Sequence, residues 1–226
     1  MFIGHVAVAL GAKKASPKTS FGTLLLAALW PDIVWPLFLA LGWERVAIVP
    51  GATAVSPLDF TRYPLSHSLL ADFGWAMLLA GVYLVFRKNL RGALVVWFCV
   101  LSHWLLDALS HRPDLPLYPG SSTLVGLGLW NSVYGTVLVE GSMFVVALVI
   151  YSHATQPKDK IGDYAFRSFV ALLVLLYLLG LSGAPPPNVE AIEMAGFLSW
   201  LFIPWAYWID RHRPLRAPQV QVLPPE

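Results

Sequence analysis

Residues 92–110 read GALVVWFCVLSHWLLDALS, an apolar run that contains no lysine or arginine. A helix needs about 20 predominantly apolar residues to cross the hydrocarbon core of a bilayer. The rest of the chain has a similar character, because 57% of its 226 residues are hydrophobic and only 12% are charged. A soluble domain carries about 25% charged residues. The sequence therefore indicates an integral membrane protein and not a soluble domain.

Other apolar segments of comparable length lie on both sides of this run. The segments long enough to span a bilayer are 20–42, 66–86, 92–110, 129–151, 168–184 and 191–209. Residues 2–12 are apolar but too short to span, and we expect a short interfacial or re-entrant helix there. These segments predict an all-α polytopic fold with about six transmembrane helices, in one domain over residues 1–213. Residues 214–226 are rich in proline and are expected to form a disordered tail.

The distribution of basic residues supports this order of spans independently. Of the 15 lysines and arginines, all but Arg45, Arg62 and Arg112 fall on one side of the predicted spans. Because basic residues gather in cytoplasmic loops, both termini are expected in the cytoplasm, with the chain in a bacterial inner membrane. The expected partner is the lipid bilayer. The net charge of +2 and the lack of any nucleic-acid-binding motif argue against a nucleic-acid partner.

Several ionisable residues lie inside the predicted spans, where a charged side chain costs about 2.5–3.5 kcal/mol on insertion scales. Their depth follows from the rise of an α-helix along its axis. Asp32, His103 and Glu140 each lie about 16–18 Å from the start of their span. This depth is near the middle of a hydrocarbon core of about 30 Å. Three polar groups from three helices at one depth suggest a single site.

The third span carries the sharpest pattern. His103, Asp107 and His111 follow one another at intervals of four residues, so they share one face of a helix. An imidazole and a carboxylate at this spacing can bind one metal ion. The alternative is an internal His–Asp hydrogen bond that only ties helices together. Inside a membrane, with further carboxylates at the same depth, we favour the functional site.

The neighbouring spans add further candidates. Pro31 precedes Asp32, and a proline there is expected to break the first span and turn polar backbone toward a cavity. A simple packing kink is the alternative. Glu140 fits a local hydrogen bond within its helix and a metal ligand or general base equally well. His67 opens the second span near the outer surface, so it joins Asp32 in one site only if the loop before it dips inward.

Two more candidates depend on the path of the chain. His5 approaches Asp32 only if residues 2–12 are re-entrant, and is otherwise a histidine of the cytoplasmic surface. Asp72 follows His67 by five residues. The two side chains therefore do not share a tight helical face, and we expect Asp72 at most in a supporting position.

The candidate residues occur in an order that resembles a known family. Gly4-His5, Pro31-Asp32, Ser66-His67-Ser68 and His103-x-x-Leu106-Asp107 are similar to motifs of the YdjM-like predicted membrane-bound metal-dependent hydrolases. The resemblance covers roughly residues 1–115 and is most specific at SHWLLDALSHRPD, residues 102–114. It implies a metal site with His5, Asp32, His67, His103 and Asp107 as ligands. Many members carry a His-Arg-Gly-x-Thr-His-Ser segment, whose first three residues are replaced here by Arg62, Tyr63 and Pro64, so that one histidine is absent.

The pattern and the resemblance together predict a membrane-embedded metal-dependent hydrolase. Histidine and aspartate ligands suit Zn²⁺ best, with Mn²⁺ and Fe²⁺ as alternatives. Metal-activated water would hydrolyse a phosphoester or a lipid-linked substrate that reaches the site from the bilayer or its outer face. Glu140 or His111 would act as the catalytic residue that moves the proton.

Two rival interpretations remain open at this point. A proton or metal-ion transporter or channel needs the same intramembrane His, Asp and Glu groups, and broken helices suit transporters. The sequence shows no inverted repeat, however, and the last two spans contain almost no polar groups. The second rival is a non-catalytic scaffold, in which buried polar groups fix the register of neighbouring helices.

Overall fold

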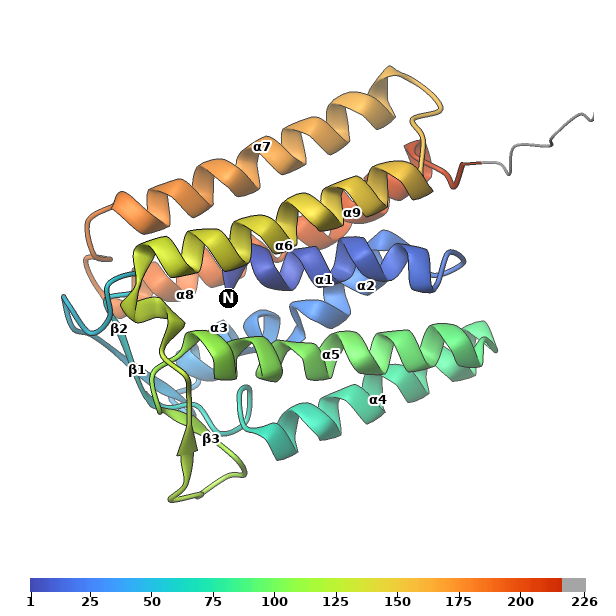
Figure 1. The fold of residues 1–226 in the computed structure, drawn as a ribbon. Coiled ribbons are helices and arrows are strands. Elements are labelled where there is room, and N and C mark those ends of the chain that lie inside the picture. The colour runs from blue at the N-terminus through green and yellow to red at the C-terminus, as the bar shows by residue number, and fades with distance from the viewer. Residues whose placement is uncertain (217–226) are drawn as a thin grey trace, which may run out of the picture.

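The computed structural model describes residues 1–216 and consists mainly of helices that lie side by side in one bundle (Figure 1). The helices are α1 (Phe2–Ala15), α2 (Phe21–Ala28), α3 (Trp30–Ala40), α4 (Leu69–Arg87), α5 (Leu90–Ser110), α6 (Val133–Ala154), α7 (Lys160–Ser182), α8 (Val189–Ser199) and α9 (Phe202–His212), with a short 3₁₀ turn η1 (Leu129–Asn131). Two antiparallel hairpins pair β1 (Arg45–Ile48) with β2 (Leu58–Arg62) and β3 (Leu115–Pro116) with β4 (Leu124–Val125).

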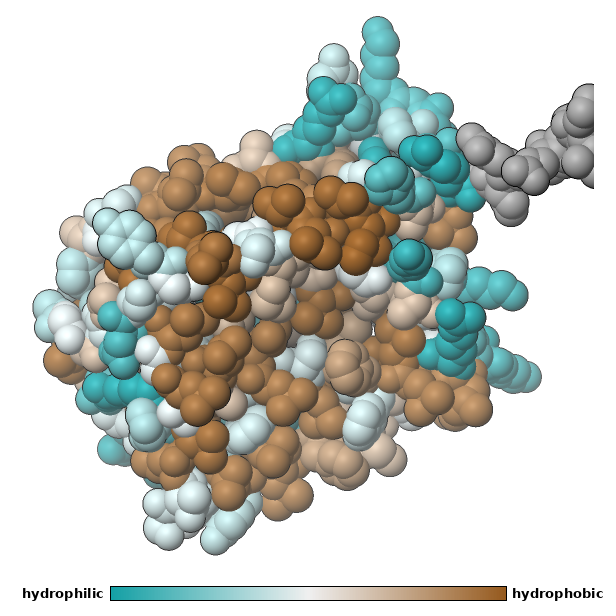
Figure 2. Space-filling model, in the orientation of Figure 1, coloured by the Kyte–Doolittle hydropathy of each residue, from teal (hydrophilic) through white to brown (hydrophobic). Residues whose placement is uncertain are grey.

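The long helices confirm the predicted membrane fold. In the described part of the chain, α4, α5, α6, α7 and the α8–α9 pair are long and apolar enough to cross a membrane. The α2–α3 pair is a sixth candidate span, bent by 54°. Apolar side chains cover the middle of the molecule, and hydrophilic ones gather at the right-hand end of the view in Figure 2. We call this end the basic end, because the lysines of the α1–α2 and α4–α5 connections lie there.

The first span is broken where the sequence predicted a break. Leu29 separates α2 from α3, and Pro31 lies in the first turn of α3. Proline has no N–H to continue the hydrogen-bond ladder of α2. The break places Asp32 in the first turn of α3. α2 packs on α9 and α3 packs on α8, so this broken span lies along the last span of the bundle.

Helix α1 lies inside the bundle and not on its surface. It packs mainly on α6, with further contacts to α2 and α5, and in Figure 1 it runs between α6 and α5 from the middle of the molecule to the basic end. Its sequence is apolar on every face, which is typical of a buried helix. Val6, Ala9 and Leu10 are fully buried. Of the two expectations for residues 2–12, this placement matches the re-entrant helix and not the interfacial one.

The loops opposite the basic end contain structure that the sequence did not predict. The two hairpins lie there, and both are too short to give a recognisable alternation of apolar and polar residues. Helix α7 begins at Lys160, eight residues before the expected span at 168. Hydropathy detects only the apolar part of a helix, and the first turns of α7 are polar. At the end of the described chain, Leu215 pairs with Thr155, and residues 217–226 of the expected tail lie outside the described residues.

The junction between α7 and α9 gives a direct test of packing. Asp159 caps α7 and accepts hydrogen bonds of 2.8 Å from the His212 imidazole and from the backbone N–H of Gly162. These two bonds, that of His212 first, lower the pKa of the Asp159 carboxyl. A Cβ atom added at Gly162 would collide with the backbone carbonyl oxygen of His212.

We therefore expect Gly162→Ala to destabilise the fold by about 1–3 kcal/mol, the usual range for an overpacked site. Gly74→Ala on α4 is the matched control, because an added Cβ meets no atom there within 4 Å. It should be neutral or slightly stabilising, since alanine favours helix by about 1 kcal/mol over glycine. Thermal unfolding in detergent measures both. Equal stability of the two variants would contradict this packing.

Candidate metal centre

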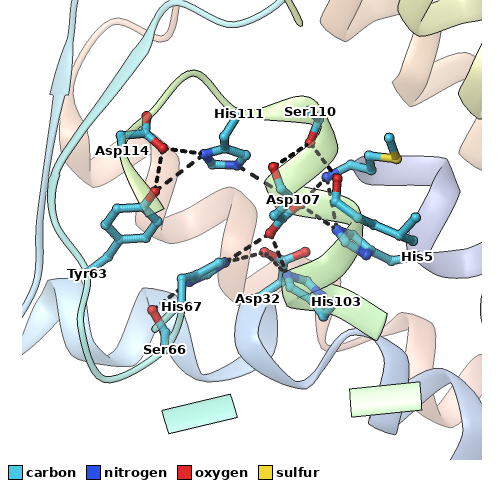
Figure 3. Close-up of polar contacts among 12 residues, drawn as sticks. His5, Asp32, Tyr63, Ser66, His67, His103, Asp107, Ser110, His111 and Asp114 are labelled. Atoms are coloured by element: carbon cyan, nitrogen blue, oxygen red, sulfur yellow. Dashed lines mark hydrogen bonds and ion pairs between the residues drawn. The ribbon is translucent and has the colours of Figure 1, made fainter. Parts of the chain in front are cut away.

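Five ionisable side chains from four segments converge in the interior (Figure 3). His5 comes from α1, Asp32 from the first turn of α3, and His67 from the loop before α4, while His103 and Asp107 come from α5. Potential ligand atoms form two groups, each within 4.8 Å: His5 with His103 and Asp107, and Asp32 with His67 and His103. His103 belongs to both groups. The structure thus brings together all five residues that the sequence and the family resemblance singled out as ligands.

The spacing of these atoms suits a small cation. Nε2 of His5 lies 3.1 Å from Oδ1 of Asp107, and Nε2 of His103 lies 3.2 Å from Oδ2 of the same residue. Oδ1 of Asp32 lies 3.5 Å from Nε2 of His67 and 3.6 Å from Nε2 of His103. Neighbouring ligands on a tetrahedral zinc ion with bonds of about 2.0–2.1 Å are about 3.3 Å apart. The separations observed are therefore close to the edges of such a tetrahedron.

The break in the first span helps to orient His103. Its Nδ1 donates a hydrogen bond of 2.9 Å to the backbone carbonyl of Ala28, the last residue of α2. In an unbroken helix this carbonyl would accept from the residue four positions later, so the break makes it accessible to a side chain. With Nδ1 as the donor, Nε2 of His103 points at Asp32 and Asp107. Outer partners of this kind fix the tautomer and ring orientation of metal-bound histidines.

His67 is held in the same way by a buried chain of polar groups. Glu44 is 2% exposed and accepts hydrogen bonds from the backbone N–H groups of Leu65 and Ser66, at 2.7 and 2.9 Å. It also accepts from the Ser66 hydroxyl at 2.5 Å. The Ser66 oxygen therefore accepts from Nδ1 of His67, which lies 2.7 Å away. This series of hydrogen bonds leaves Nε2 of His67 free to face Asp32. The loop before α4 thus reaches inward, as a site shared with Asp32 requires.

His111 connects the cluster to the outer loops. Its Nε2 lies 4.0 Å from Oδ1 of Asp107, and its Nδ1 donates to Asp114 at 3.0 Å. The Tyr63 hydroxyl donates to the same carboxylate at 2.7 Å. Burial, with the Asp114 carboxylate as the next cause, raises the pKa of Tyr63, so the tyrosine stays protonated. Figure 3 shows these three side chains as a group beside Asp107.

Two observations indicate that a cation belongs among these groups. Within residues 1–216, Nε2 of His103 is buried and has no hydrogen-bond partner, although two carboxylates face it. An unprotonated Nε2 beside carboxylates presents lone pairs to lone pairs, which is favourable only with a positive charge between them. In the first group the α-amino group of Met1 supplies such a charge, 2.5 Å from Asp107 and 2.9 Å from Nε2 of His5, so a metal ion between these two residues would have to displace it. In the second group, no lysine, arginine or amino group among residues 1–216 forms an ion pair with Asp32, and the donor set of Asp32, His67 and His103 fits a divalent metal ion.

The cluster is closed except at Asp32. The side chains of His5, His67, His103 and Asp107 are at most 5% exposed, whereas the side chain of Asp32 is 41% exposed. A catalytic metal site keeps one position open for water or substrate, while a structural site is fully enclosed. The exposed carboxylate of Asp32 thus marks the side of the cluster that small molecules can reach.

Glu140 and Asp72 do not belong to either group of potential ligands. Glu140 on α6 is buried and accepts from the backbone N–H of Gly4 at 3.3 Å, so it contacts α1. Asp72 on α4 is fully buried, and neither of its carboxylate oxygens has a hydrogen-bond partner among the described residues.

Sequence reasoning missed the residues that hold the histidines. Glu44 and Ser66 are far apart in the chain, and no spacing rule relates them. Asp114 lies only three residues after His111, in the turn that follows the end of α5 at Ser110, and this short separation is what brings the two side chains together.

The fold and the cluster together define an all-α integral membrane protein with a buried His/Asp centre that has the geometry to hold a metal ion. The family model described as YdjM inner membrane protein matches residues 1–185, and the chain belongs to this family. The match confirms the resemblance seen in the sequence and places the protein in the inner membrane. No curated protein and no solved structure matches the chain.

The role of Glu44 can be tested by removing its carboxylate. In Glu44→Ala the N–H groups of Leu65 and Ser66 lose their partner, at about 1–3 kcal/mol for each buried group left unpaired. We expect faster amide hydrogen exchange across residues 63–68 and a lower melting temperature. Glu190→Ala, at an exposed position in the first turn of α8, is the control and should change neither. Unchanged exchange in Glu44→Ala would show that other contacts hold this loop.

Proposed function

We propose that the protein is a membrane-embedded metal-dependent hydrolase that acts on a phosphoester or lipid-linked substrate. The observation that supports this most strongly is the orientation of the histidines. The Nδ1 atoms of His67, His103 and His111 are each paired with an acceptor outside the cluster. Their Nε2 atoms all face the carboxylates of Asp32 or Asp107. Histidines that serve as metal ligands are held in this way.

His103 would hold one ion through Nε2, together with either Asp32 and His67 or His5 and Asp107, because its Nδ1 donates to the Ala28 carbonyl and only one nitrogen is left for a metal. Nitrogen and carboxylate ligands of this kind favour Zn²⁺. A bound divalent cation polarises a phosphoryl oxygen and lowers the pKa of a water molecule from 15.7 to about 7. Asp32, as the exposed member of the cluster, would orient the substrate and the incoming water.

His111 is the best placed residue to carry a proton away from this centre. It lies between Asp107 and Asp114. Asp114 and Tyr63 line a cavity of about 680 Å³ that is formed mainly by the loops after β2 and β3. A proton accepted by His111 would pass through Asp114 to water in this cavity. Glu140 is the alternative carrier, although its carboxylate contacts α1 and not the ligand cluster.

The same proposal includes an orientation in the membrane. The basic end carries the loops that the positive-inside rule assigns to the cytoplasm. Both termini would then be cytoplasmic, and the hairpins and the cavity beside Asp114 would face the opposite side. The substrate would enter from the outer leaflet or from the water beyond it.

Metal content is the first test. Purified protein in detergent should contain at least one equivalent of zinc or another transition metal, and His103→Ala and Asp107→Ala should lose it while remaining helical. His153→Ala is the control, because this exposed histidine near the end of α6 lies far along the helix from Glu140 and outside both groups of ligands. Absence of metal after loading with zinc, manganese and iron would overturn the hydrolase proposal. Proton flux in liposomes that is abolished by Asp107→Asn would then favour a transporter.

The proton carrier can be tested separately from the metal ligands. His111→Asn should keep the metal and lower the rate of hydrolysis of p-nitrophenyl phosphate by about 10²–10⁴-fold, the usual contribution of a positioned general acid or base. Asp114→Asn should have a smaller effect in the same direction. If Glu140→Gln shows the large loss and His111→Asn does not, the two roles are reversed.

A further inference from the structure

A second cavity, separate from the one beside Asp114, lies between α7 and the β1–β2 loop. Its volume is about 560 Å³, within the range of roughly 300–1,000 Å³ that is typical of small-molecule sites. The wall from α7 includes Leu176 and Leu179, and the loop adds Pro50 and Val55. Most of the lining is therefore apolar, as expected for a site that receives a hydrocarbon chain.

Two residues in the wall of this cavity lie next to groups that contact Asp107. Trp130 lines the cavity, and its ring centroid lies 4.4 Å from that of His111. Phe2 lines it as well, next to Met1, whose amino group contacts Asp107. Only a few side chains thus separate the cavity from the ligand cluster.

The outer side of the cavity opens on a surface that faces lipid. Helix α7 is a candidate membrane span, and its leucines beside the cavity are exposed, among them Leu175, Leu178 and Leu179. A groove in such a surface is filled by the apolar chains of the bilayer and not by water. A water-soluble ligand would have to leave water to enter here, whereas a bilayer lipid would not.

Two of the polar residues in the lining come from helices. Glu140 on α6 accepts a hydrogen bond from the backbone N–H of Gly4. The hydroxyl oxygen of Tyr177, also in the lining, is buried and has no hydrogen-bond partner in the part of the chain that the structure describes. A buried hydroxyl without a partner is costly, and a ligand with ester or glycerol oxygens would supply one.

We propose that this cavity holds the hydrocarbon chain of a bilayer lipid, with its headgroup at the end of the cavity beside Trp130, whose ring lies against His111. The Tyr177 hydroxyl would donate to an ester oxygen at the junction of chain and headgroup. The identity of the headgroup as a phosphoester rests on the proposed function. The proposed position of the hydrocarbon chain rests only on the cavity and on the exposed face of α7.

The test uses phosphatidic acid with a photoreactive diazirine near the middle of one acyl chain. This lipid is present at low concentration in phosphatidylcholine vesicles that contain the full-length protein. After irradiation, crosslinked peptides are identified by mass spectrometry. We expect crosslinks concentrated on residues 176–186 and 50–58. An even distribution over the exposed faces of α4, α5 and α6 would overturn the proposal.

A pair of matched variants decides whether the cavity itself binds the chain. Gly180 lines the cavity, Gly74 lies on the lipid-facing side of α4, and an added Cβ meets no atom within 4 Å at either position. Gly180→Leu should narrow the cavity and reduce crosslinking at 176–186 and 50–58 at least fivefold, whereas Gly74→Leu should leave it unchanged. Equal crosslinking in the two variants would overturn the proposal.

Failure of this inference and failure of the proposed function give different results. If Gly180→Leu crosslinks normally while the protein binds zinc and hydrolyses p-nitrophenyl phosphate, the lipid site is wrong and the hydrolase stands. If crosslinks lie at the cavity and are reduced in Gly180→Leu but the protein binds no metal, the lipid site is correct and the hydrolase proposal is wrong.

Discussion

The buried carboxylate of Asp107 is the contact on which the interior of this protein depends. An isolated charge in a membrane protein is costly, so it must be neutralised by groups that approach it from other segments. The Met1 amino group and His5 do so from α1, His67 from the loop before α4, and His103 from its own helix. Asp107 therefore fixes the position of α1 relative to α5 and the depth to which the loop before α4 reaches. These contacts also turn the Nε2 atoms of the three histidines toward one carboxylate, as binding of a metal ion requires.

The polar groups around this cluster are as important as the cluster itself. Glu44 and Ser66 orient His67, the carbonyl of Ala28 orients His103, and Asp114 orients His111. Each acceptor comes from a different segment, and one exists only because a proline breaks the first span. The break and the cluster are thus parts of one arrangement: a straight first span would keep the Ala28 carbonyl within its own helix.

Much of the fold was predictable from the sequence, because spans and basic loops are set by composition over windows of about 20 residues. The break at Pro31 and the shared face of His103 and Asp107 were predictable from local rules. The convergence of His5 and His67 was not, since it depends on whether α1 enters the bundle and how far a loop dips, and the family resemblance alone indicated it. Glu44 had no local signal, because its partners at Leu65 and Ser66 are joined to it only by tertiary structure. The hairpins were missed because strands of only two to five residues leave almost no periodic pattern in the sequence.

The burial of α1 has a consequence for the order in which the protein is made. Domains and segments emerge from the ribosome starting at the N-terminus, so α1 is synthesised long before α6, the helix on which it mainly packs. Too short to span on its own, α1 has no stable place in the bilayer until the later helices have been inserted. The main packing surface for α1, which carries His5, is complete only after α6 has been added. A chain that ends before α6 would contain all five candidate ligands but would lack the helix on which α1 mainly packs, so His5 would be held in the cluster only through the contacts of α1 with α2 and α5.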